Sequence, residues 1–180
     1  MKLSISHIAP YLPYGLKVQT SWSIDGFGGI CTSKAIGLYR DELLLEPYTI
    51  LHKHIPYRIS IDRTSLSDPD TKPLLLPMSS LYTEMEDGTV PIVELARIAV
   101  DYEWGLGKHY CDGLYIDAAE SIYDIFYYNE SHKVFELANI YGIGGVAPNQ
   151  LDLFTYLFEH HYDVFSLIDK GLAIDKTKIK

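Results

Sequence analysis

Short runs of alternating apolar and polar residues dominate the first part of the chain. Residues 16–22 and 30–36 alternate in this way, and the segment 26–29 between them is rich in glycine. Two alternating runs joined by a glycine-rich turn predict a β-hairpin. Two further strands are predicted at residues 43–45 and 57–61, because turn-forming residues bound both runs.

The pattern changes after residue 78, where helical spacing joins the alternation. Residues 91–102 place their apolar side chains on one helical face, and Pro91 lies in the first turn, where proline is tolerated. Residues 122–128 and 134–137 predict a second hairpin, because two apolar and aromatic runs flank a polar turn.

The longest helical pattern begins at Asn149, which is predicted to cap the helix N-terminus, and ends near Gly171. Apolar residues and one histidine recur at helical spacing along it: Leu151, Phe154, Phe158, His161, Phe165 and Ile168. This spacing predicts a long C-terminal amphipathic helix.

Together these elements predict a single α+β domain over residues 1–180. Residues 1–78 are expected to be β-rich, forming an N-terminal antiparallel sheet or a small open barrel. Residues 79–180 are expected to be mixed and largely helical, with helices, a hairpin and the long C-terminal helix. A chain of 180 residues can bury a core without a metal or disulfide, and no cofactor is predicted.

The charge balance narrows the choice of partners. The chain has 24 acidic residues against 15 Lys and Arg, for a formal net charge of −9. A negative charge disfavours direct binding to nucleic acid or to an anionic membrane. There is no apolar run of about 18 residues, as a membrane span needs, and no secretory signal pattern. We therefore expect a cytoplasmic protein in which Cys31 and Cys111 are reduced thiols.

The many acidic residues and tyrosines of the chain suggest a surface that binds another protein. Residues 101–169 contain 12 acidic residues, opposed only by Lys108 and Lys133. The chain also has 15 tyrosines, a residue that suits both half-buried strands and wet protein interfaces. The acidic region is either a solvated face that keeps the protein soluble or a surface that meets a basic partner.

Residues 142–147, Gly-Ile-Gly-Gly-Val-Ala, match the G-x-G-x-x-A fingerprint of dinucleotide-binding loops. Gly142, Gly144 and Gly145 would let the main chain approach a pyrophosphate at a helix N-terminus. However, Pro148 delays the helix that follows, and the first half of the chain has an antiparallel pattern. A strand-to-helix turn without a ligand is the alternative interpretation.

His52 and His54 form a candidate metal site. On a strand both imidazoles would point to the same face, as in many H-x-H metal sites. Cupin-type sites place a Glu three or four residues beyond the second His, but Tyr57 and Arg58 occupy those positions. Two exposed histidines on an edge strand are the alternative.

Other groups of reactive residues match known chemistry less well. His109 and Cys111 would share a strand face, as a base and a thiol nucleophile do, but no third member accompanies them. His160 and His161 are adjacent, whereas zinc helices place their histidines four apart. Residues 104–109 lack the spacing of a P-loop, and no Gly-x-Ser-x-Gly elbow is present. No catalytic residue is assigned.

Two stretches at opposite ends of the chain carry a resemblance. Residues 7–17, HIAPYLPYGLK, and residues 149–175, which include LFEHHYDVF and GLAID, resemble short uncharacterised proteins encoded by phages and mobile elements of Bacteroidetes. The resemblance implies a viral or prophage origin and an intracellular setting. It implies no catalytic residue, because the group has no assigned activity.

The leading functional hypothesis is a non-enzymatic phage- or prophage-encoded accessory protein. It would bind a host or phage protein through an acidic, tyrosine-rich surface. The first alternative is a small-ligand-binding protein or metal-dependent enzyme that uses His52 and His54 or the 142–145 loop. An enzyme would gather such residues in one concave pocket. The second alternative is a structural component of a virion, which would form a closed or higher assembly.

Overall fold

A computed structural model describes residues 2–24, 27–46, 48–52, 55–59, 63–99, 109–110, 113–115, 125–139, 141 and 143–179. The chain divides into two compact units. The first unit comprises Met1–Leu76 together with Phe158–Lys180, and the second comprises Pro77–Leu157. The division after Leu76 lies close to residue 78, where the sequence pattern changes. The return of the C-terminal segment, residues 158–180, to the first unit is not evident from the sequence.

The first unit is built around a six-stranded mixed sheet with the strand order β13-β7-β1-β2-β3-β6. Its strands are β1 (Lys17–Ile24), β2 (Phe27–Tyr39), β3 (Glu42–Leu45), β6 (Arg63–Ser65), β7 (Lys72–Leu75) and β13 (Ile174–Asp175). All neighbours are antiparallel except β13 and β7. The predicted α+β class and the N-terminal sheet are confirmed, but the sheet is mixed rather than antiparallel because β13 runs parallel to β7. Its two outermost strands do not pair with each other in the described structure, so no closed barrel is formed.

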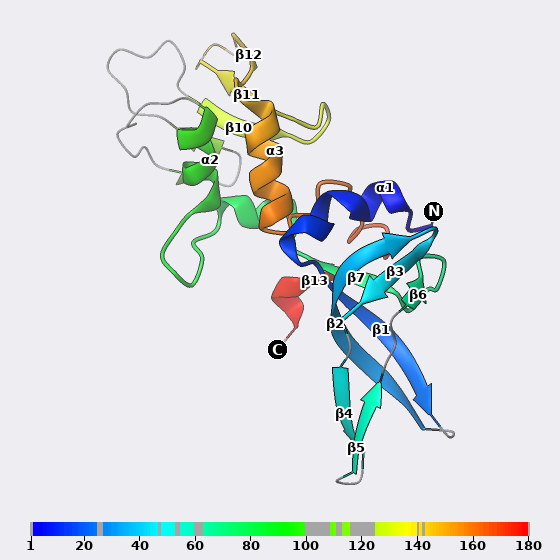
Figure 1. Ribbon diagram of the computed structural model, residues 1–180. Helices are drawn as coiled ribbons and strands as arrows, with labels where there is room; N and C mark the ends of the chain where they lie inside the picture. Colours follow the sequence, from blue (N-terminus) through cyan, green and yellow to red (C-terminus); the bar gives the residue numbers. More distant parts are fainter. Residues whose placement is uncertain are drawn as a thin grey trace. The chain divides into compact units, whose positions relative to one another are not determined.

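The predicted first hairpin is confirmed as the antiparallel pair β1–β2, which Figure 1 shows as a long curved ribbon. Alternation along β1 buries Val18 and Thr20 and exposes Lys17 and Ser21. The predicted strand at 43–45 corresponds to β3. The predicted strand at 57–61 corresponds in part to β5 (Ile55–Ile59), which pairs with β4 (Tyr48–His52) in a two-stranded sheet, and residues 60–61 lie outside the described residues.

The N-terminal helices and the C-terminal segment add buried residues to the first unit's core. The chain begins with α1 (Ile5–Ile8) and the 3₁₀ helix η1 (Ala9–Tyr14), and it ends with η3 (Lys176–Lys178). The fully or almost fully buried residues of this core include Ile8, Tyr11, Leu16, Leu43, Leu45, Leu75 and Leu167. Burial of each such side chain contributes about 1.5–3 kcal/mol, so the C-terminal segment is an integral part of this unit.

The predicted long C-terminal helix is corrected by the structure, where α3 comprises only Gln150–Glu159. His161 and Ser166 have φ angles of +61° and +54°, which no α-helix can contain. Tyr162 forms a parallel bridge with Leu76, and the main-chain N–H of Leu76 donates to the carbonyl of His161 at 2.8 Å. Pairing with the end of β7 thus replaces the helical hydrogen bonds.

The apolar residues between Tyr162 and Ile168 are nevertheless buried or half-buried. Phe158, Phe165 and Ile168 pack against the first unit's core, but the last two do so from turns. The carboxylate of Asp163 holds these turns by accepting the N–H groups of Leu167 and Ile168, each at 2.7 Å.

The second unit contains a five-stranded antiparallel sheet with the strand order β12-β11-β10-β9-β8. Its elements are η2 (Met78–Tyr82), α2 (Pro91–Ala99), β8 (His109–Tyr110), β9 (Gly113–Tyr115), β10 (Ile125–Asn129), β11 (Val134–Ala138) and β12 (Gly144–Val146). The predicted second hairpin is confirmed as β10–β11. The predicted helix at 91–102 is confirmed up to Ala99, and residues 100–102 and 122–124 lie outside the described residues.

Aromatic packing fills the core of the second unit. The rings of Phe126 and Phe135 stack with centroids 5.4 Å apart, and Phe154 of α3 meets Phe135 edge-on at 6.1 Å. Asn149, predicted to cap α3, instead donates from Nδ2 to the carbonyl of Ile98 at 3.0 Å, near the end of α2. Its main-chain carbonyl, rather than its side chain, accepts the first N–H groups of α3.

None of the helices that the structure describes is long and apolar enough to cross a membrane.

Candidate functional site

The glycines of the predicted nucleotide loop belong to a sheet. Gly144 and Gly145 lie in β12, which pairs antiparallel with β11, whereas Gly142 lies outside the described residues. A Cβ at position 144 would collide with the main chain of Leu137 and Ala138. Close strand pairing therefore explains Gly144 without a ligand. Nucleotide binding by this loop stays a prediction.

The predicted metal site falls at the edge of the described structure. His52 is the last residue of β4, where its main chain lies opposite Ile55. The side chain of His52 and the whole of His54 lie outside the described residues. Among the side chains that are described, no three His, Cys, Asp or Glu residues are grouped in a way that could hold a metal ion.

The remaining reactive residues lie partly outside the described residues or have structural roles. His109 is placed in β8, and Cys111 lies outside the described residues. Asp163 is only 4% exposed, and both its oxygens accept main-chain N–H groups. The helix α3 ends at Glu159, and His161 lies in the turn that follows it, with a φ angle of +61°. The zinc-helix arrangement is therefore not formed.

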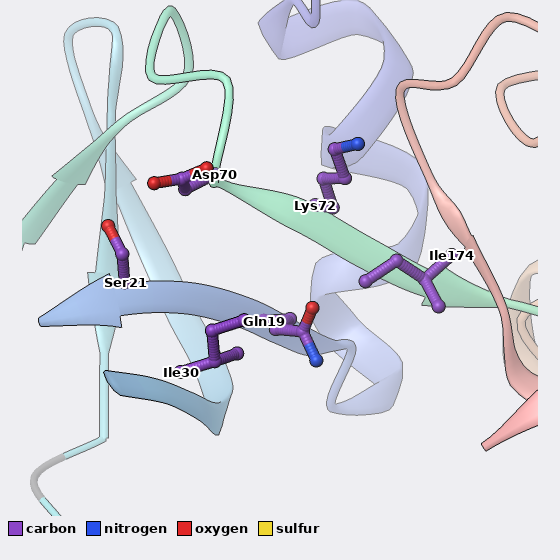
Figure 2. A pocket seen from close by; sticks show the side chains of 6 residues that line it. All are labelled: Gln19, Ser21, Ile30, Asp70, Lys72 and Ile174. Atoms are coloured by element: carbon purple, nitrogen blue, oxygen red, sulfur yellow. The ribbon is translucent and has the colours of Figure 1, made fainter. Parts of the chain in front are cut away.

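A shallow hollow of about 270 Å³ lies on the outward face of the first unit's sheet. Figure 2 shows its lining side chains, which come from β1, β2 and the neighbourhoods of β7 and β13: Gln19, Ser21, Ile30, Asp70, Lys72 and Ile174. Small-molecule sites commonly have volumes of about 300–1,000 Å³ and largely enclose the ligand. This hollow is smaller, and its lining includes exposed residues such as Ser21 and Asp70. It does not define an active site.

A polar cluster that sequence reasoning missed lies on the β10–β11 hairpin. Glu136 accepts hydrogen bonds from the hydroxyl of Tyr127 at 2.5 Å and from Nδ2 of Asn129 at 3.0 Å. Its Oε1 also lies 3.0 Å from Nδ1 of His132. Tyr127 and Glu136 are directly opposite each other in the hairpin. Pairing the two predicted strands of this hairpin in register would have placed Tyr127 beside Glu136, and this was the signal in the sequence that could have revealed the pair.

The electrostatics of this cluster favour a fixed charge over acid–base chemistry. Hydrogen bonds from Tyr127 and then His132 lower the pKa of Glu136, while the hydrogen bond to Glu136 raises the pKa of Tyr127. Glu136 therefore stays ionised at neutral pH. Asn129 also accepts the main-chain N–H groups of Ser131 and His132 at 3.0 and 3.1 Å. The cluster stabilises the hairpin turn and leaves a negative charge on this face.

The most unusual surface of the second unit is the segment from Tyr141 to Leu151, here called the 141–151 segment. It contains four large apolar side chains that are 62–80% exposed: Tyr141, Ile143, Val146 and Leu151. The segment contains β12, which is the terminal strand of its sheet among the described strands. Single exposed apolar residues are ordinary, whereas larger contiguous patches mark interaction surfaces, so four exposed apolar residues close together in sequence make this segment the candidate for such a surface.

Comparison with protein-family models, with curated proteins and with solved structures finds no match to this chain. The functional argument therefore depends on the chain's own residues.

Proposed function

We propose that the protein is a non-enzymatic accessory protein, encoded by a phage or prophage, that binds a host or phage protein in the host cytoplasm. The observation that supports binding is the exposure of four large apolar side chains within the 141–151 segment. The resemblance of residues 7–17 and 149–175 to phage and mobile-element proteins motivates the proposed origin.

Exposure of this segment is costly unless a partner covers it. Burial of apolar surface contributes about 25 cal/mol per Å², and large exposed patches promote association. Tyr141 and Leu151 are each 80% exposed, although leucine is among the residue types most often buried. Tyrosine is also enriched at the centres of protein interfaces. A protein surface is therefore the partner that best matches this segment.

The charge distribution favours a basic partner. Residues 101–169 contain 12 acidic residues and two lysines. Among the described acids of this region, Glu130 and Asp152 are exposed, and Glu136 is ionised. Asp163 is buried and does not contribute to a surface. Charge complementarity of this kind accelerates association and selects partners by sign.

Tyrosines contribute to the proposed surface selectively. Tyr141 is 80% exposed, whereas Tyr11 and Tyr162 are among the largest fully buried side chains of the first unit. The proposed surface is therefore narrower than the tyrosine content of the chain suggests. It is centred on Tyr141 and the apolar residues that follow it.

A matched pair of variants tests this proposal. Ile143 in the second unit and Ile30 in the first unit are each 69% exposed. We expect Ile143→Glu to reduce capture of partner protein from host lysate at least about tenfold, because it places a charge in an apolar interface. Ile30→Glu should leave capture unchanged. Equal capture by the two variants, or no specific capture by the wild type, would contradict the proposal.

A further inference from the structure

We propose that the outer edge of β12 pairs with an extended, basic segment of the partner protein, which adds a strand to the second unit's sheet. This inference rests on the proposed function, because it specifies how the 141–151 segment binds. It concerns the main chain of β12, whereas the preceding proposal concerns the exposed side chains.

Hydrogen bonds to β11 define which groups of β12 face outward. The carbonyl of Ile143 accepts the N–H of Asn139 at 3.0 Å, and the N–H of Ala147 donates to the carbonyl of Phe135 at 2.8 Å. Alternate residues of an antiparallel strand point their main-chain groups to opposite edges. The N–H and C=O groups of Gly144 and Val146 therefore point to the outer edge, which no other described strand occupies.

β12 is short, at three residues, but its outer edge carries neither of the residue types, lysine and proline, that commonly protect natural edge strands. Natural edge strands are commonly protected by lysine, by proline or by a bulge. β12 has the sequence Gly-Gly-Val, and each of its residues is exposed. No atom of the described residues, apart from the chain neighbours, lies within 4 Å of the position that a Cβ would take at Gly145. Because Gly144 and Gly145 have no side chains, the faces of β12 at these two positions carry nothing that the side chains of an incoming strand would have to displace.

Charge distinguishes a basic segment from a second copy of this chain. Val146 lies directly opposite Glu136 in the register of β11 and β12, so the ionised carboxylate of Glu136 is on the same face of the sheet as the Val146 side chain. A strand added beside Val146 would place its side chains within about one Debye length of this charge. A second copy would instead bring another chain with a net charge of −9. Lysine or arginine at alternate positions of the partner would complement the edge.

The test uses the full ¹⁵N-labelled chain and a ten-residue peptide of alternating lysine and valine, with a glutamate-for-lysine peptide as its control. Binding of the lysine peptide should slow amide exchange at Gly144 and Val146 while leaving Gly145 unchanged. The glutamate peptide should bind at least about tenfold more weakly. Absence of binding by the lysine peptide tighter than about 1 mM, or protection outside β12, would overturn the inference.

Two substitutions at one position separate main-chain pairing from side-chain contact. Val146→Pro removes the outward N–H and leaves the N–H groups of Gly145 and Ala147 intact, as edge strands tolerate. Val146→Thr keeps both the N–H and a β-branched side chain. We expect about a tenfold loss of peptide affinity for the proline variant and little change for the threonine variant. Retained amide protection at Ala147 checks that the proline variant is folded.

The outcomes also separate this inference from the proposed function. If Ile143→Glu abolishes partner capture but Val146→Pro and Val146→Thr capture equally, the surface binds through side chains alone, and only strand addition is overturned. If Ile143→Glu has no effect, the proposed function itself fails. If the proline variant loses self-association in sedimentation while the lysine peptide does not bind, the occupant is a second copy, which contradicts the basic segment.

Discussion

The hydroxyl of Tyr11 donates a 2.7 Å hydrogen bond to the main-chain carbonyl of Tyr162, a residue 151 positions later in the chain. The same hydroxyl accepts the N–H of Val164 at 3.3 Å. Tyr11 is fully buried and its ring meets Phe158 edge-on at 5.2 Å. One side chain near the N-terminus thus satisfies two main-chain groups of the C-terminal segment and closes the core of the first unit.

Substitution of Tyr11 by Phe is predicted to destabilise the protein by about 1–3 kcal/mol, because it removes two buried hydrogen bonds and leaves the carbonyl of Tyr162 and the N–H of Val164 only their 2.9 Å hydrogen bond with each other. The comparison is Tyr14→Phe, since Tyr14 is 36% exposed and belongs to the same helix η1. Urea unfolding should give a lower midpoint for the first variant and an unchanged midpoint for the second. Equal urea midpoints for the two variants would contradict the structural role assigned to the Tyr11 hydroxyl.

Replacement of Asp163 by Ala is predicted to be more damaging than replacement of the exposed Glu159 by Ala. The buried Asp163 carboxylate accepts two N–H groups at 2.7 Å, and hydrogen bonds to charged groups contribute about 1.5–3 kcal/mol each. We expect faster amide exchange at Leu167 and Ile168 and a lower unfolding midpoint. If both variants unfold at the same urea concentration, Asp163 does not hold the C-terminal turns.

Acidification is predicted to destabilise the first unit through two histidines. Burial and then the Lys176 ammonium lower the pKa of His161 below its usual 6.5, and its buried Nε2 has no hydrogen-bond partner among the described residues. Burial and then Lys170 lower the pKa of His7, whose Nδ1 accepts the N–H of Ser4 at 3.2 Å. Both rings are therefore favoured in the neutral form.

The sign of the effect follows from these lowered pKa values. The unfolded chain binds protons near pH 6.5, whereas the folded chain binds them only at lower pH, so stability falls as the pH drops below about 6.5. Urea midpoints should be lower at about pH 5.5 than at about pH 7.5. His161→Asn should reduce this difference, because Asn does not titrate and tolerates positive φ. His132→Asn, at an exposed position, should preserve it, and a midpoint that rises on acidification would contradict the account.

Gly144→Ala is predicted to disrupt β12, whereas Gly145→Ala should be tolerated. The added Cβ meets the main chain of Leu137 in the first case and open space in the second. A main-chain clash in a sheet costs about 1–3 kcal/mol, and the amide of Gly145 should exchange faster in the Gly144 variant. Equal stability of the two variants would count against the pairing. A nucleotide bound by wild type and lost in both variants would favour the fingerprint interpretation instead.

The sequence predicted the elements that depend on local patterns. Alternation located β1–β2 and β10–β11, and helical spacing located α2. The end of α3 was not predictable, because the spacing of Phe165 and Ile168 suits a helix as well as the observed turns. Contacts made by distant residues, Tyr11 and Leu76, decide between the two.

The candidate surface was predictable only in part. The glycine pattern at residues 142–147 resembles a nucleotide loop because glycines serve close main-chain approach in both settings. Only the pairing of β12 with β11 reveals that the neighbour of Gly144 is a strand. The exposure of Ile143 and Val146 could not be predicted either, because a sequence pattern does not show whether other parts of the chain bury apolar residues near a turn. The acidic character of the region was evident from composition.

The most direct test of the central claim is site-specific photo-crosslinking in the host cell. A benzoylphenylalanine residue at Tyr141, which is 80% exposed, is compared with one at Tyr39, which is 47% exposed in the first unit. We expect a discrete crosslinked partner from position 141 and none from position 39. Crosslinks of equal yield from both positions, or none from position 141, would contradict binding through the 141–151 segment.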